Sequence, residues 1–555
     1  MKTIIIGGVA GGMSAATRLR RLDERREIVV FERGAYVSFA NCGLPYFVGG
    51  VIEDRSALLL QTPESLAARF GLDVRVRHEV VGIDAAAKTV TVRNLDTGSE
   101  LTETYDTLVL AGGSSAGLGP TTGFVPTHTL RSVEDVDRVL EVLRSLDGPE
   151  RVVVVGAGYI GLEAVENLLA RGAMVTLVQR GPQILSPLDP EMAAPIEQVL
   201  RGHGIDVRLG TTVTGARPGV VQLSDGTEVA ADLVIEATGV HPETGLARAA
   251  GITVGQTGGI VVDGHQRTSD PSIFAVGDGV EKTDALDGRG ILVTMAGLAN
   301  RHGRAAADAI AGIDPGPAAP AFGTGIVGVL GITIATVGWS EKRLRASGRA
   351  HRVIHTHPSS HAGYYPGAQQ MAVKLLVDPA DDSILGAQIV GGEGVDKRID
   401  VIATAMAGHI SASGLSRLEL AYAPQYGSAK DAVNLAGYVA DNLRTGNTRT
   451  VQWHELDTLL DAGATLVDVR SPEEFTAGAI PGAVNVPLDE LRDRHLELAN
   501  GQLVVHCQVG QRGHTAARIL TQLGYDVRNL DGGYLTWKAG TSPSRTSATA
   551  EKEAA

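Results

Sequence analysis

The sequence predicts an α/β protein built from repeated units of strand, tight turn and helix. Apolar strands over residues 2–6 and 151–155 each run into a glycine-rich turn, and a third strand ends at Cys507 before a loop that contains glycine. Such turns join strands of a parallel sheet to helices, and glycine supplies the backbone freedom they need. The 70 glycines and the aromatic content of 4% fit a fold with many turns of this kind.

Composition narrows the functional classes. Hydrophobic residues make up 43% of the 555 residues and charged residues 20%, as in ordinary globular proteins. This length corresponds to about three to five domains. The net charge of −14 argues against nucleic acid or an anionic membrane as a partner. No apolar run is long enough to span a bilayer, and the first residues are typical of a buried strand rather than a signal peptide. With only two cysteines there is no disulfide framework, so we expect a cytoplasmic protein with reduced thiols.

The first glycine turn lies in a dinucleotide-binding context. The strand over 2–6 is followed by Gly-Gly-Val-Ala-Gly-Gly at 7–12, a helix over 13–22 and a strand over 27–31 that ends at Glu32. In this order the helix N-terminus receives a pyrophosphate and the carboxylate binds a ribose hydroxyl. Val9 occupies the usual place of the second glycine, so the backbone is less open there.

The second glycine turn is a complete G-x-G-x-x-G. Gly156-Ala-Gly-Tyr-Ile-Gly161 follows the strand over 151–155 and precedes a helix that runs through Leu169. The next strand, over 174–178, ends at Gln179 and Arg180, where a carboxylate would favour NADH. Neutral Gln179 beside Arg180 tolerates a 2′-phosphate. The sequence therefore predicts a nicotinamide site that leans towards NADPH and leaves NADH open.

Two further stretches carry a family resemblance. The segment Thr268-Ser-Asp-Pro-Ser-Ile-Phe-Ala-Val-Gly-Asp278 is a strand that ends at an acid, and Tyr105-Asp-Thr-Leu-Val-Leu-Ala-Gly-Gly113 is a strand and turn. With the two glycine turns, they resemble the pyridine nucleotide-disulfide reductase family over residues 1–445. The resemblance implies FAD and NADPH or NADH in two Rossmann-like domains. The implied cofactor-binding residues are Gly7, Ala10, Gly11, Gly12, Glu32, Arg33, Asn41, Val80, Ala111, Gly112, Arg131, Gly277, Asp278, Gly156, Gly158, Tyr159, Ile160, Gly161, Glu163, Gln179, Arg180 and Gly239.

Cys42 indicates the type of acceptor. It has no partner in a C-x4-C pair, which excludes dithiol exchange. The family resemblance then implies the single-cysteine branch, which contains reductases of coenzyme A disulfide or persulfide and oxidases and peroxidases that cycle a sulfenic acid. The segment Ser38-Phe-Ala-Asn-Cys-Gly-Leu-Pro-Tyr46 resembles the coenzyme A disulfide reductase group. In peroxidases and oxidases a histidine usually occupies the position of Ala10, and its absence argues against peroxide chemistry.

Coenzyme A needs cationic contacts for its phosphates. Ser14, Arg18 and Arg21 share one face of the first helix, which is either a coenzyme A surface or a solvated basic face. The resemblance implies that these residues contact coenzyme A together with Ser38 and Asn41.

The family resemblance also implies a homodimer that forms through an α+β dimerisation domain, with tyrosines of the partner subunit near Cys42. The matching residues here are Tyr364 and Tyr422, with Tyr365 and Tyr426 as alternatives, and Lys430 as a phosphate contact. Gln425 stands where the family pattern has proline. Each tyrosine could equally be an ordinary interface residue.

The C-terminal region resembles a single rhodanese domain over 451–540. Its motifs are Thr465–Phe475, Ile480–Pro487, Leu503–Gly513 and Asp531–Trp537. A loop of successive N–H groups and a helix from Thr515 would stabilise a thiolate or persulfide at Cys507, with Arg512 adding positive charge. The C-x4-R spacing is one residue tighter than the C-x5-R of cysteine phosphatases and suits sulfur. Asp468 and Arg470 are expected to be structural.

The predicted architecture and function follow from these parts. The domains are 1–112 with 241–318 for FAD, 113–240 for NAD(P)H, 319–445 for dimerisation and 451–540 for the α/β rhodanese unit, with a disordered tail at 541–555. The sequence predicts NAD(P)H-dependent reduction of coenzyme A persulfide, polysulfide or coenzyme A disulfide at Cys42, with sulfane sulfur handled at Cys507. Alternatives are an NAD(P)H oxidase that reduces dioxygen and a redox-gated sulfur carrier or sensor. No metal site is predicted.

Overall fold

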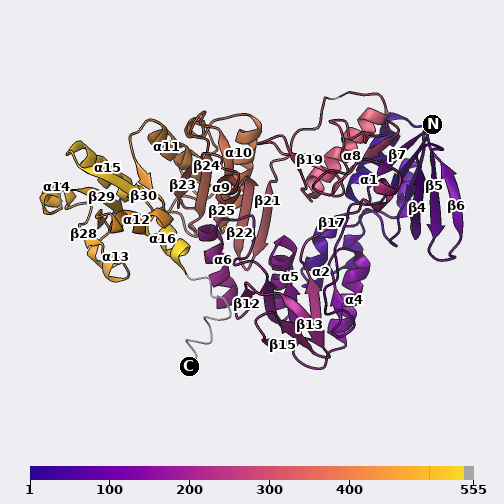
Figure 1. Cartoon of the computed structure of the whole chain (residues 1–555), viewed down its shortest axis with the longest axis horizontal. Helices are drawn as coiled ribbons and strands as arrows, with labels where there is room; N and C mark the ends of the chain where they lie inside the picture. The colour runs from indigo at the N-terminus through magenta and orange to yellow at the C-terminus, as the bar shows by residue number, and fades with distance from the viewer. Residues whose placement is uncertain (315, 499–500, 543–555) are drawn as a thin grey trace. The chain divides into compact units, whose positions relative to one another are not determined.

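The computed structural model describes residues 1–314, 316–498 and 501–542, and the chain divides into two compact units (Figure 1). One unit comprises Met1–Val178 and Thr211–Ala321, and the other comprises Gln179–Gly210 and the chain from Phe322 onward. Most of the predicted tail, residues 543–555, lies outside the described residues. Among the described residues, no helix is both long enough and apolar enough to cross a membrane.

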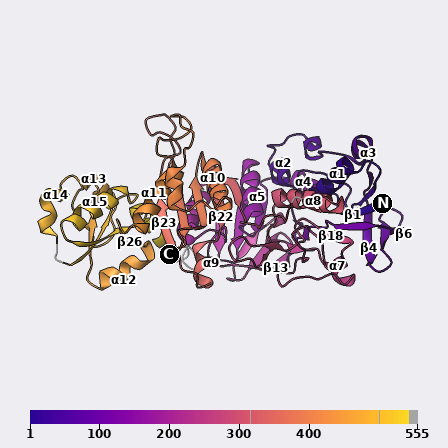
Figure 2. The same cartoon turned by 90° about the horizontal axis from the view of Figure 1, so that it is seen from above.

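The first unit is organised around a five-stranded parallel sheet of order β18-β7-β1-β2-β3. Its strands are β1 (Lys2–Ile6), β2 (Glu27–Phe31), β3 (Asp73–Arg75), β7 (Thr107–Leu110) and β18 (Ile273–Ala275). Helices α1 (Ala10–Leu22) and α8 (Ala296–Ile310) lie side by side, as Figures 1 and 2 show. Apolar side chains of β1, β2 and α1 form the core of this half. The first glycine turn follows the carboxyl end of β1, the middle strand of the sheet.

Shorter elements complete this half. They are the 3-10 helices η1 (Asn41–Gly43) and η2 (Arg55–Leu58), helices α2 (Leu44–Val48), α3 (Pro63–Phe70) and α7 (Gly245–Ala249), the antiparallel sheet β4 (His78–Asp84), β5 (Thr89–Asn94) and β6 (Glu100–Thr104), and the pairs β8 (Ser114–Ser115) with β17 (His241–Pro242) and β19 (Lys282–Thr283) with β20 (Gly290–Ile291).

A second parallel sheet carries the other glycine turn. Strands β9 (Thr127–His128), β10 (Arg151–Val155), β11 (Met174–Gln179) and β16 (Leu233–Glu236) pair in the order β11-β10-β16-β9. Helices α4 (Val133–Arg144) and α5 (Tyr159–Ala170) and the antiparallel sheet β13 (Val213–Arg217), β14 (Val220–Leu223) and β15 (Glu228–Ala230) belong to the same part. The repetition of strand, glycine turn and helix is the predicted one.

The second unit contains an antiparallel five-stranded sheet of order β21-β22-β25-β24-β23. Its elements are β21 (Gly325–Val329), β22 (Ile332–Gly338), α9 (Glu341–Ala346), β23 (Arg352–Thr356), β24 (Ala372–Val377), β25 (Ile384–Gly391), α10 (Val395–Ala407), η3 (Ser413–Arg417) and α11 (Ala432–Arg444). Helix α6 (Pro190–Gly202) and strand β12 (Asp206–Leu209) belong to the same compact unit.

The C-terminal part of this unit has a parallel sheet of order β26-β30-β29-β27-β28. Its strands are β26 (Thr450–Val451), β27 (Thr465–Asp468), β28 (Val484–Asn485), β29 (Gln502–His506) and β30 (Asp526–Leu530). Its helices are η4 (Trp453–Glu455), α12 (Leu456–Asp461), α13 (Pro472–Thr476), α14 (Leu491–Arg494), η5 (His495–Glu497), α15 (Gln511–Gln522) and α16 (Gly533–Thr541). The predicted helix start at Thr515 is wrong, because Gly510, at φ +87°, already turns the chain into α15.

Candidate active sites around Cys42 and Cys507

The first glycine turn packs so closely that side chains are excluded from it. A Cβ on Gly7, at φ +107°, would lie 2.3 Å from the carbonyl oxygen of Ala111, and one on Gly12 would lie 2.0 Å from that of Gly7. Helix α1 begins at Ala10, three residues before the predicted start. It has neither a side-chain cap nor an acidic residue in its first turn. A helix N-terminus of this kind suits the pyrophosphate of a dinucleotide.

Glu32 links the end of β2 to the glycine turn. Its carboxylate accepts hydrogen bonds from the backbone N–H groups of Gly8 at 2.8 Å and Gly34 at 2.7 Å. The neighbouring Arg33 lies 3.6 Å from a carboxylate oxygen of Glu243. The predicted ribose contact therefore also fixes the shape of the turn.

Asp278 is joined to two other elements of the first unit. The hydroxyl of Ser114 donates to its carboxylate at 3.3 Å, and Arg131 donates to the same hydroxyl at 3.1 Å. Gly277 precedes it in a left-handed conformation at φ +85°. Of the other predicted cofactor residues, Gly11 begins α1 together with Ala10, Val80 is buried in β4, and Ala111 and Gly112 follow β7. The glycine turn after β1, Ala111 and Gly112 after β7, and Gly277 and Asp278 after β18 thus follow the carboxyl ends of three neighbouring parallel strands.

Lys282 belongs to this cluster and is absent from the predicted set. Its buried ammonium donates to the carbonyls of Gly277 at 2.6 Å and Val280 at 2.8 Å. Burial lowers the pKa of Lys282 to about 8, although Asp278 opposes the shift. The only signal for it in the sequence is a lysine four residues after the acid that ends the strand.

Cys42 lies in the short turn η1 and is exposed, as is Asn41 beside it. Burial of part of the thiol raises the pKa of Cys42, and the charges of Glu163 and Asp278 add to the rise. Two of the predicted cofactor residues therefore lie within electrostatic reach of the thiol. Ser38, a non-glycine residue at φ +46°, precedes this turn in a left-handed conformation that stores strain.

Helix α2, which follows Cys42, packs on α5 of the second glycine turn. The hydroxyl of Tyr46 donates to Glu163 at 3.4 Å. Burial raises the pKa of Glu163, a shift that the Tyr46 hydrogen bond opposes. The segment that carries the thiol and the helix of the second glycine turn therefore meet within one compact unit.

The predicted coenzyme A face of α1 is partly engaged by α8. The guanidinium of Arg18 pairs with Asp308 at 2.7 Å, and the hydroxyl of Ser14 donates to Asn300 at 2.8 Å. Arg21 is exposed. Sequence spacing correctly placed these residues on one helix but could not reveal that Asp308, far along the chain, holds Arg18.

The second glycine turn is equally tight. A Cβ on Gly156 would lie 2.4 Å from the carbonyl oxygen of Ala237, and one on Gly161 only 1.9 Å from that of Gly156. At Gly158 and Gly239, by contrast, a Cβ would enter open space. This is the pattern expected where a pyrophosphate approaches the backbone.

Helix α5 supplies the remaining residues predicted on this side. It begins at Tyr159 with no side-chain cap and no acidic residue in its first turn. Ile160 is exposed and Glu163 lies one turn further along the helix. Gln179 ends β11 and Arg180 follows it.

The predicted tyrosines form an exposed group in the second unit. The hydroxyls of Tyr364 and Tyr422 are 2.7 Å apart, and this hydrogen bond is the main cause of a raised pKa of Tyr422. Both rings are exposed, at 76% and 48% respectively, as are Tyr365, Tyr426 and Lys430. Large exposed aromatic groups of this kind mark a contact surface.

Cys507 follows β29 directly and is fully buried. Its carbonyl accepts a hydrogen bond from the N–H of Tyr534 at 2.8 Å, and that of Gln508 accepts one from Leu535 at 3.0 Å. A Cβ on Gly533 would lie 2.4 Å from the Cys507 carbonyl oxygen. The start of α16 therefore clamps the loop that carries the thiol.

Charged residues surround this loop. Arg512 donates to both carboxylate oxygens of Glu474, at 2.7 and 2.6 Å, and this pairing lowers the pKa of Glu474 to about 2. Glu474 raises the pKa of Arg512 most, and Cys507 adds to that rise, so Arg512 lies within reach of the thiol. The predicted cation is thus present with a carboxylate partner that sequence reasoning missed.

Asp468 and Arg470 form a buried pair beneath the loop. Arg470 donates to Asp468 at 2.6 Å, to the carbonyl of Gly478 at 2.7 Å and to the side chain of Gln508 at 3.1 Å. Its guanidinium also lies 4.4 Å from the ring centroid of Tyr534. These contacts hold the residue after Cys507 and make the pair a structural support.

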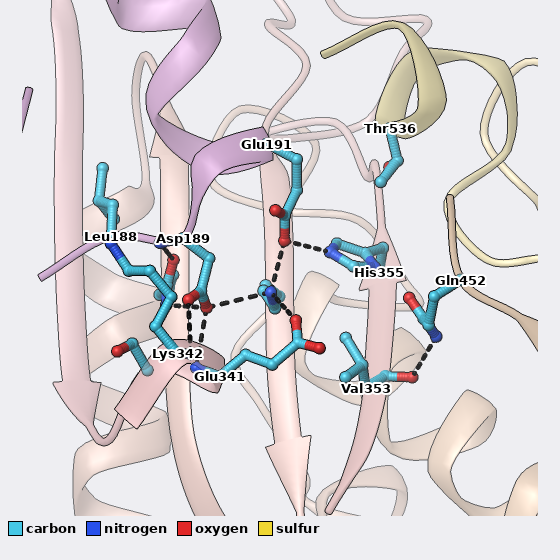
Figure 3. A network of polar contacts seen from close by, with 12 residues as sticks. Leu188, Asp189, Glu191, Glu341, Lys342, Val353, His355, Gln452 and Thr536 are labelled. Atoms are coloured by element: carbon cyan, nitrogen blue, oxygen red, sulfur yellow. Dashed lines mark hydrogen bonds and ion pairs between the residues drawn. The ribbon is translucent and has the colours of Figure 1, made fainter. Parts of the chain in front are cut away.

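A buried ionic network, also missed from the sequence, lies beside the C-terminal sheet. Lys374, fully buried in β24, is paired with Asp189 at 3.0 Å, with Glu341 at 2.6 Å and with Glu191. Figure 3 shows the three carboxylates pointing toward one another, with His355 beside Glu191. Burial alone would lower the pKa of Lys374, but the carboxylates outweigh it and raise the pKa.

His355 connects this network to the clamp of the Cys507 loop. Its Nε2 lies 3.2 Å from Glu191 and its Nδ1 lies 2.8 Å from Asp531. Burial would lower the pKa of His355, but hydrogen bonds to Asp531 and Glu191 raise it to about 9. Asp531 lies directly between β30 and the turn that begins α16, so the network supports the residues that hold Cys507.

Comparison with protein families identifies all parts of this architecture. The pyridine nucleotide-disulphide oxidoreductase model matches residues 1–298, and the dimerisation-domain model of the same family matches 326–433. This chain belongs to the pyridine nucleotide-disulphide oxidoreductase family. The rhodanese-like domain model matches 452–540. The predicted fold class and the fusion of a reductase to a rhodanese domain are therefore confirmed.

Three relatives illustrate the similarity. The reduced CoADR-RHD of Bacillus anthracis has a TM-score of 0.95 and 43% identity, covering 97% of this chain and 98% of that one. The NAD-dependent persulfide reductase from A. fulgidus has a TM-score of 0.90 and 34% identity, covering 97% and 100%. The coenzyme A disulfide reductase of Staphylococcus aureus (strain JH9) is 35% identical over 441 residues, 79% of this chain and 99% of the relative.

Proposed function

We propose that the protein is an FAD-dependent NAD(P)H oxidoreductase that reduces coenzyme A persulfide, polysulfide or coenzyme A disulfide at Cys42. The rhodanese-like domain handles sulfane sulfur at Cys507. The observation that carries the proposal is the position of Cys42, an exposed lone thiol whose segment packs against the helix of the second glycine turn. The relatives that match nearly the whole chain support the same class of acceptor.

Cys42 acts as the nucleophile in this proposal. Its thiolate attacks one sulfur of the acceptor, and sulfide or coenzyme A thiolate leaves with the electron pair of the broken S–S bond. A persulfide or a mixed disulfide remains on Cys42. Bound FAD would supply the two electrons, taken from NAD(P)H, that break this remaining S–S bond, so that hydrosulfide or coenzyme A thiolate leaves and Cys42 returns to the thiolate. Burial is the first cause of the raised pKa of Cys42 and the charges of Glu163 and Asp278 add to it, so the free thiol is favoured before substrate binds.

Coenzyme A is held by residues that flank the thiol. Arg21, Ser38 and Asn41 offer a cation, a hydroxyl and an amide near the start of the chain, and Ser14 lies on the same helix as Arg21. Arg18 positions α1 against α8 through Asp308 and leaves part of its guanidinium for a phosphate.

A homodimer completes the site. The Tyr364 and Tyr422 hydroxyls are hydrogen bonded to each other and exposed, which suits delivery to Cys42 of a partner subunit, where a phenol stabilises the departing thiolate. Tyr365 and Tyr426 are the alternatives, and Lys430 is the phosphate contact. The family's dimerisation domain supports this assembly. A reducing, cytoplasmic location is part of the proposal because both cysteines must remain thiols.

The nicotinamide is NADPH or NADH, with Gln179 and Arg180 favouring the former. Neutral Gln179 does not repel a 2′-phosphate and Arg180 offers it a cation. Gly156, Gly158 and Gly161 place the backbone against the pyrophosphate.

Steady-state oxidation of NADPH and NADH tests the proposal with coenzyme A persulfide, polysulfide, coenzyme A disulfide and dioxygen as acceptors. Cys42→Ser should lower the rate with the best sulfur acceptor by about 10³-fold or more, because it removes the nucleophile. Cys507→Ser should keep that rate and lose transfer of sulfane sulfur from thiosulfate to cyanide. Equal rates for wild type and Cys42→Ser would refute the proposal. Rapid oxygen consumption without a sulfur acceptor would indicate an oxidase. Negligible turnover on every small acceptor would indicate a sulfur carrier.

A further inference from the structure

A cleft of about 550 Å³ lies within the second unit, between the antiparallel sheet and the C-terminal parallel sheet. One wall comes from α9, β23 and the end of α11, and the other from β26, η4 and β30. Figure 3 shows three of its lining residues, Glu341, Val353 and Gln452. The volume falls within the range of sites that hold small-molecule ligands, about 300–1,000 Å³. Neither cysteine lines the cleft, although Glu341 and Gln452 also belong to the network that supports the Cys507 loop.

The lining is cationic in a chain whose net charge is −14. It contains four arginines and two histidines against two glutamates. Two of the arginines have partners. Arg345 donates to Glu341 and to His454, at 2.6 Å from the latter, and Arg449 pairs with the exposed Asp526 at 2.5 Å.

The other two arginines form no ion pair with a carboxylate in the described part of the chain. Arg352 makes only a long contact, 3.4 Å, to the carbonyl of Pro379. The Nε of Arg528 is buried and has no hydrogen-bond acceptor among the described residues. A buried guanidinium nitrogen without an acceptor is costly unless an anion supplies one.

Gln452 adds a second unsatisfied atom to the same cleft. Its Nε2 donates to the carbonyl of Val353 at 3.3 Å and to Asp531 at 3.2 Å, which fixes the orientation of the amide. Its Oε1 is buried without a donor among the described residues. The cleft therefore presents a guanidinium N–H on one side and an amide oxygen on the other, neither with a hydrogen-bond partner among the described residues. An anionic group and a hydroxyl or amino group of one ligand would match them.

We propose that this cleft is a binding site for a phosphorylated ligand of the nucleotide class. The diphosphate lies between Arg352 and Arg528, where planar guanidinium groups match phosphate oxygens. A hydroxyl or amino group of the nucleoside donates to Gln452. Arg449 and Arg345 line the approach and add positive charge to it.

Equilibrium dialysis of the flavin-loaded enzyme with ADP, inorganic pyrophosphate and adenosine tests the proposal. The dinucleotide sites also take ADP, so the measure is the number of ADP molecules bound per chain in wild type minus that in Arg352→Gln/Arg528→Gln. We expect a difference of one ADP site per chain. ADP should bind to this site more tightly than pyrophosphate does, and adenosine should not bind to it. Each single substitution should weaken that site by about tenfold or more, the factor of one charge-assisted hydrogen bond.

Two matched variants keep the result interpretable. Arg494→Gln removes an arginine of α14 that pairs with Glu490 and Glu497 outside the cleft, and it should bind as wild type does. Arg352→Lys/Arg528→Lys keeps both charges but loses the planar fork, so it should bind with intermediate affinity. Equal ADP binding by wild type and the Gln double variant overturns the site. Pyrophosphate binding as tightly as ADP overturns its assignment to nucleotides.

Discussion

The two cysteines of this chain occupy opposite environments. Cys42 is exposed in a short turn, and its charged neighbours are the carboxylates of Glu163 and Asp278. Cys507 is fully buried at the end of a central strand, with Arg512 in reach. Burial is the first cause of the raised pKa of Cys42, and the two carboxylates add to it.

The contrast shows which site is complete within one chain. The Cys507 loop has its cation, its helix N-terminus and its backbone clamp in place. The Cys42 site has the glycine turns and the strained Ser38, but its surroundings oppose the reactive form of the thiol. In the proposed function, the bound flavin, the substrate and a partner subunit stabilise the Cys42 thiolate.

The largest expected effect concerns the network that supports the Cys507 side. Lys374→Met removes the ammonium that pairs with Asp189, Glu191 and Glu341 and leaves these buried carboxylates uncompensated. We expect a loss of about 3–5 kcal/mol in the free energy of unfolding of the second unit. Urea unfolding followed by circular dichroism measures it.

The control for this prediction is Lys88→Met, an exposed lysine in the first unit. It should change the unfolding free energy by less than about 0.5 kcal/mol. If Lys374→Met behaves like Lys88→Met, the network contributes nothing to the stability of the unit.

The next effect separates the two sulfurs functionally. The same carboxylate oxygen of Asp531 accepts from the backbone N–H and from Nδ1 of His355, and from Gln452. Asp531→Asn removes the charge from this junction and loosens the start of α16, which clamps the Cys507 carbonyl. We expect sulfur transfer from thiosulfate to cyanide to fall about tenfold or more, because small displacements of a reacting group are costly.

Cys42-dependent NAD(P)H oxidation should remain within about twofold of wild type in the same variant, since a site packed within the other compact unit keeps its own energetics. Thr541→Ala, at the opposite end of α16 from the residues that bond to the Cys507 loop, is the matched control. A parallel loss of both activities would show that Asp531 supports the whole unit rather than the loop.

Residues near one another in the sequence account for most of what could be predicted. The glycine turns, the lone Cys42 segment and the Cys507 loop each lie within a short stretch, so their local geometry follows from strand, turn and helix signals. Lys374 could not be placed, because Glu191 lies 183 residues away and a lysine in a strand usually faces solvent. The pairing of Arg18 with Asp308 could not be predicted for a similar reason, since the two residues lie 290 positions apart in the sequence. The start of α15 was missed because the left-handed Gly510 ends the loop early.

The smallest effect tests the electrostatics of Cys42 directly. Burial is the first cause of the raised pKa of this thiol and the charge of Glu163 is the second. Glu163→Gln keeps the size of the side chain and removes the negative charge, so the thiolate becomes less unfavourable and the pKa of Cys42 falls. We expect alkylation of Cys42 by iodoacetamide at mildly alkaline pH to become a few-fold faster, because the thiolate is the reacting form.

Glu166→Gln, a second glutamate of α5 that is not among the groups raising the Cys42 pKa, is the control and should leave the rate unchanged. Alkylation with unaltered pH dependence in Glu163→Gln would mean that burial alone sets the reactivity of this thiol, and the contrast with Cys507 would then be one of exposure rather than of charge.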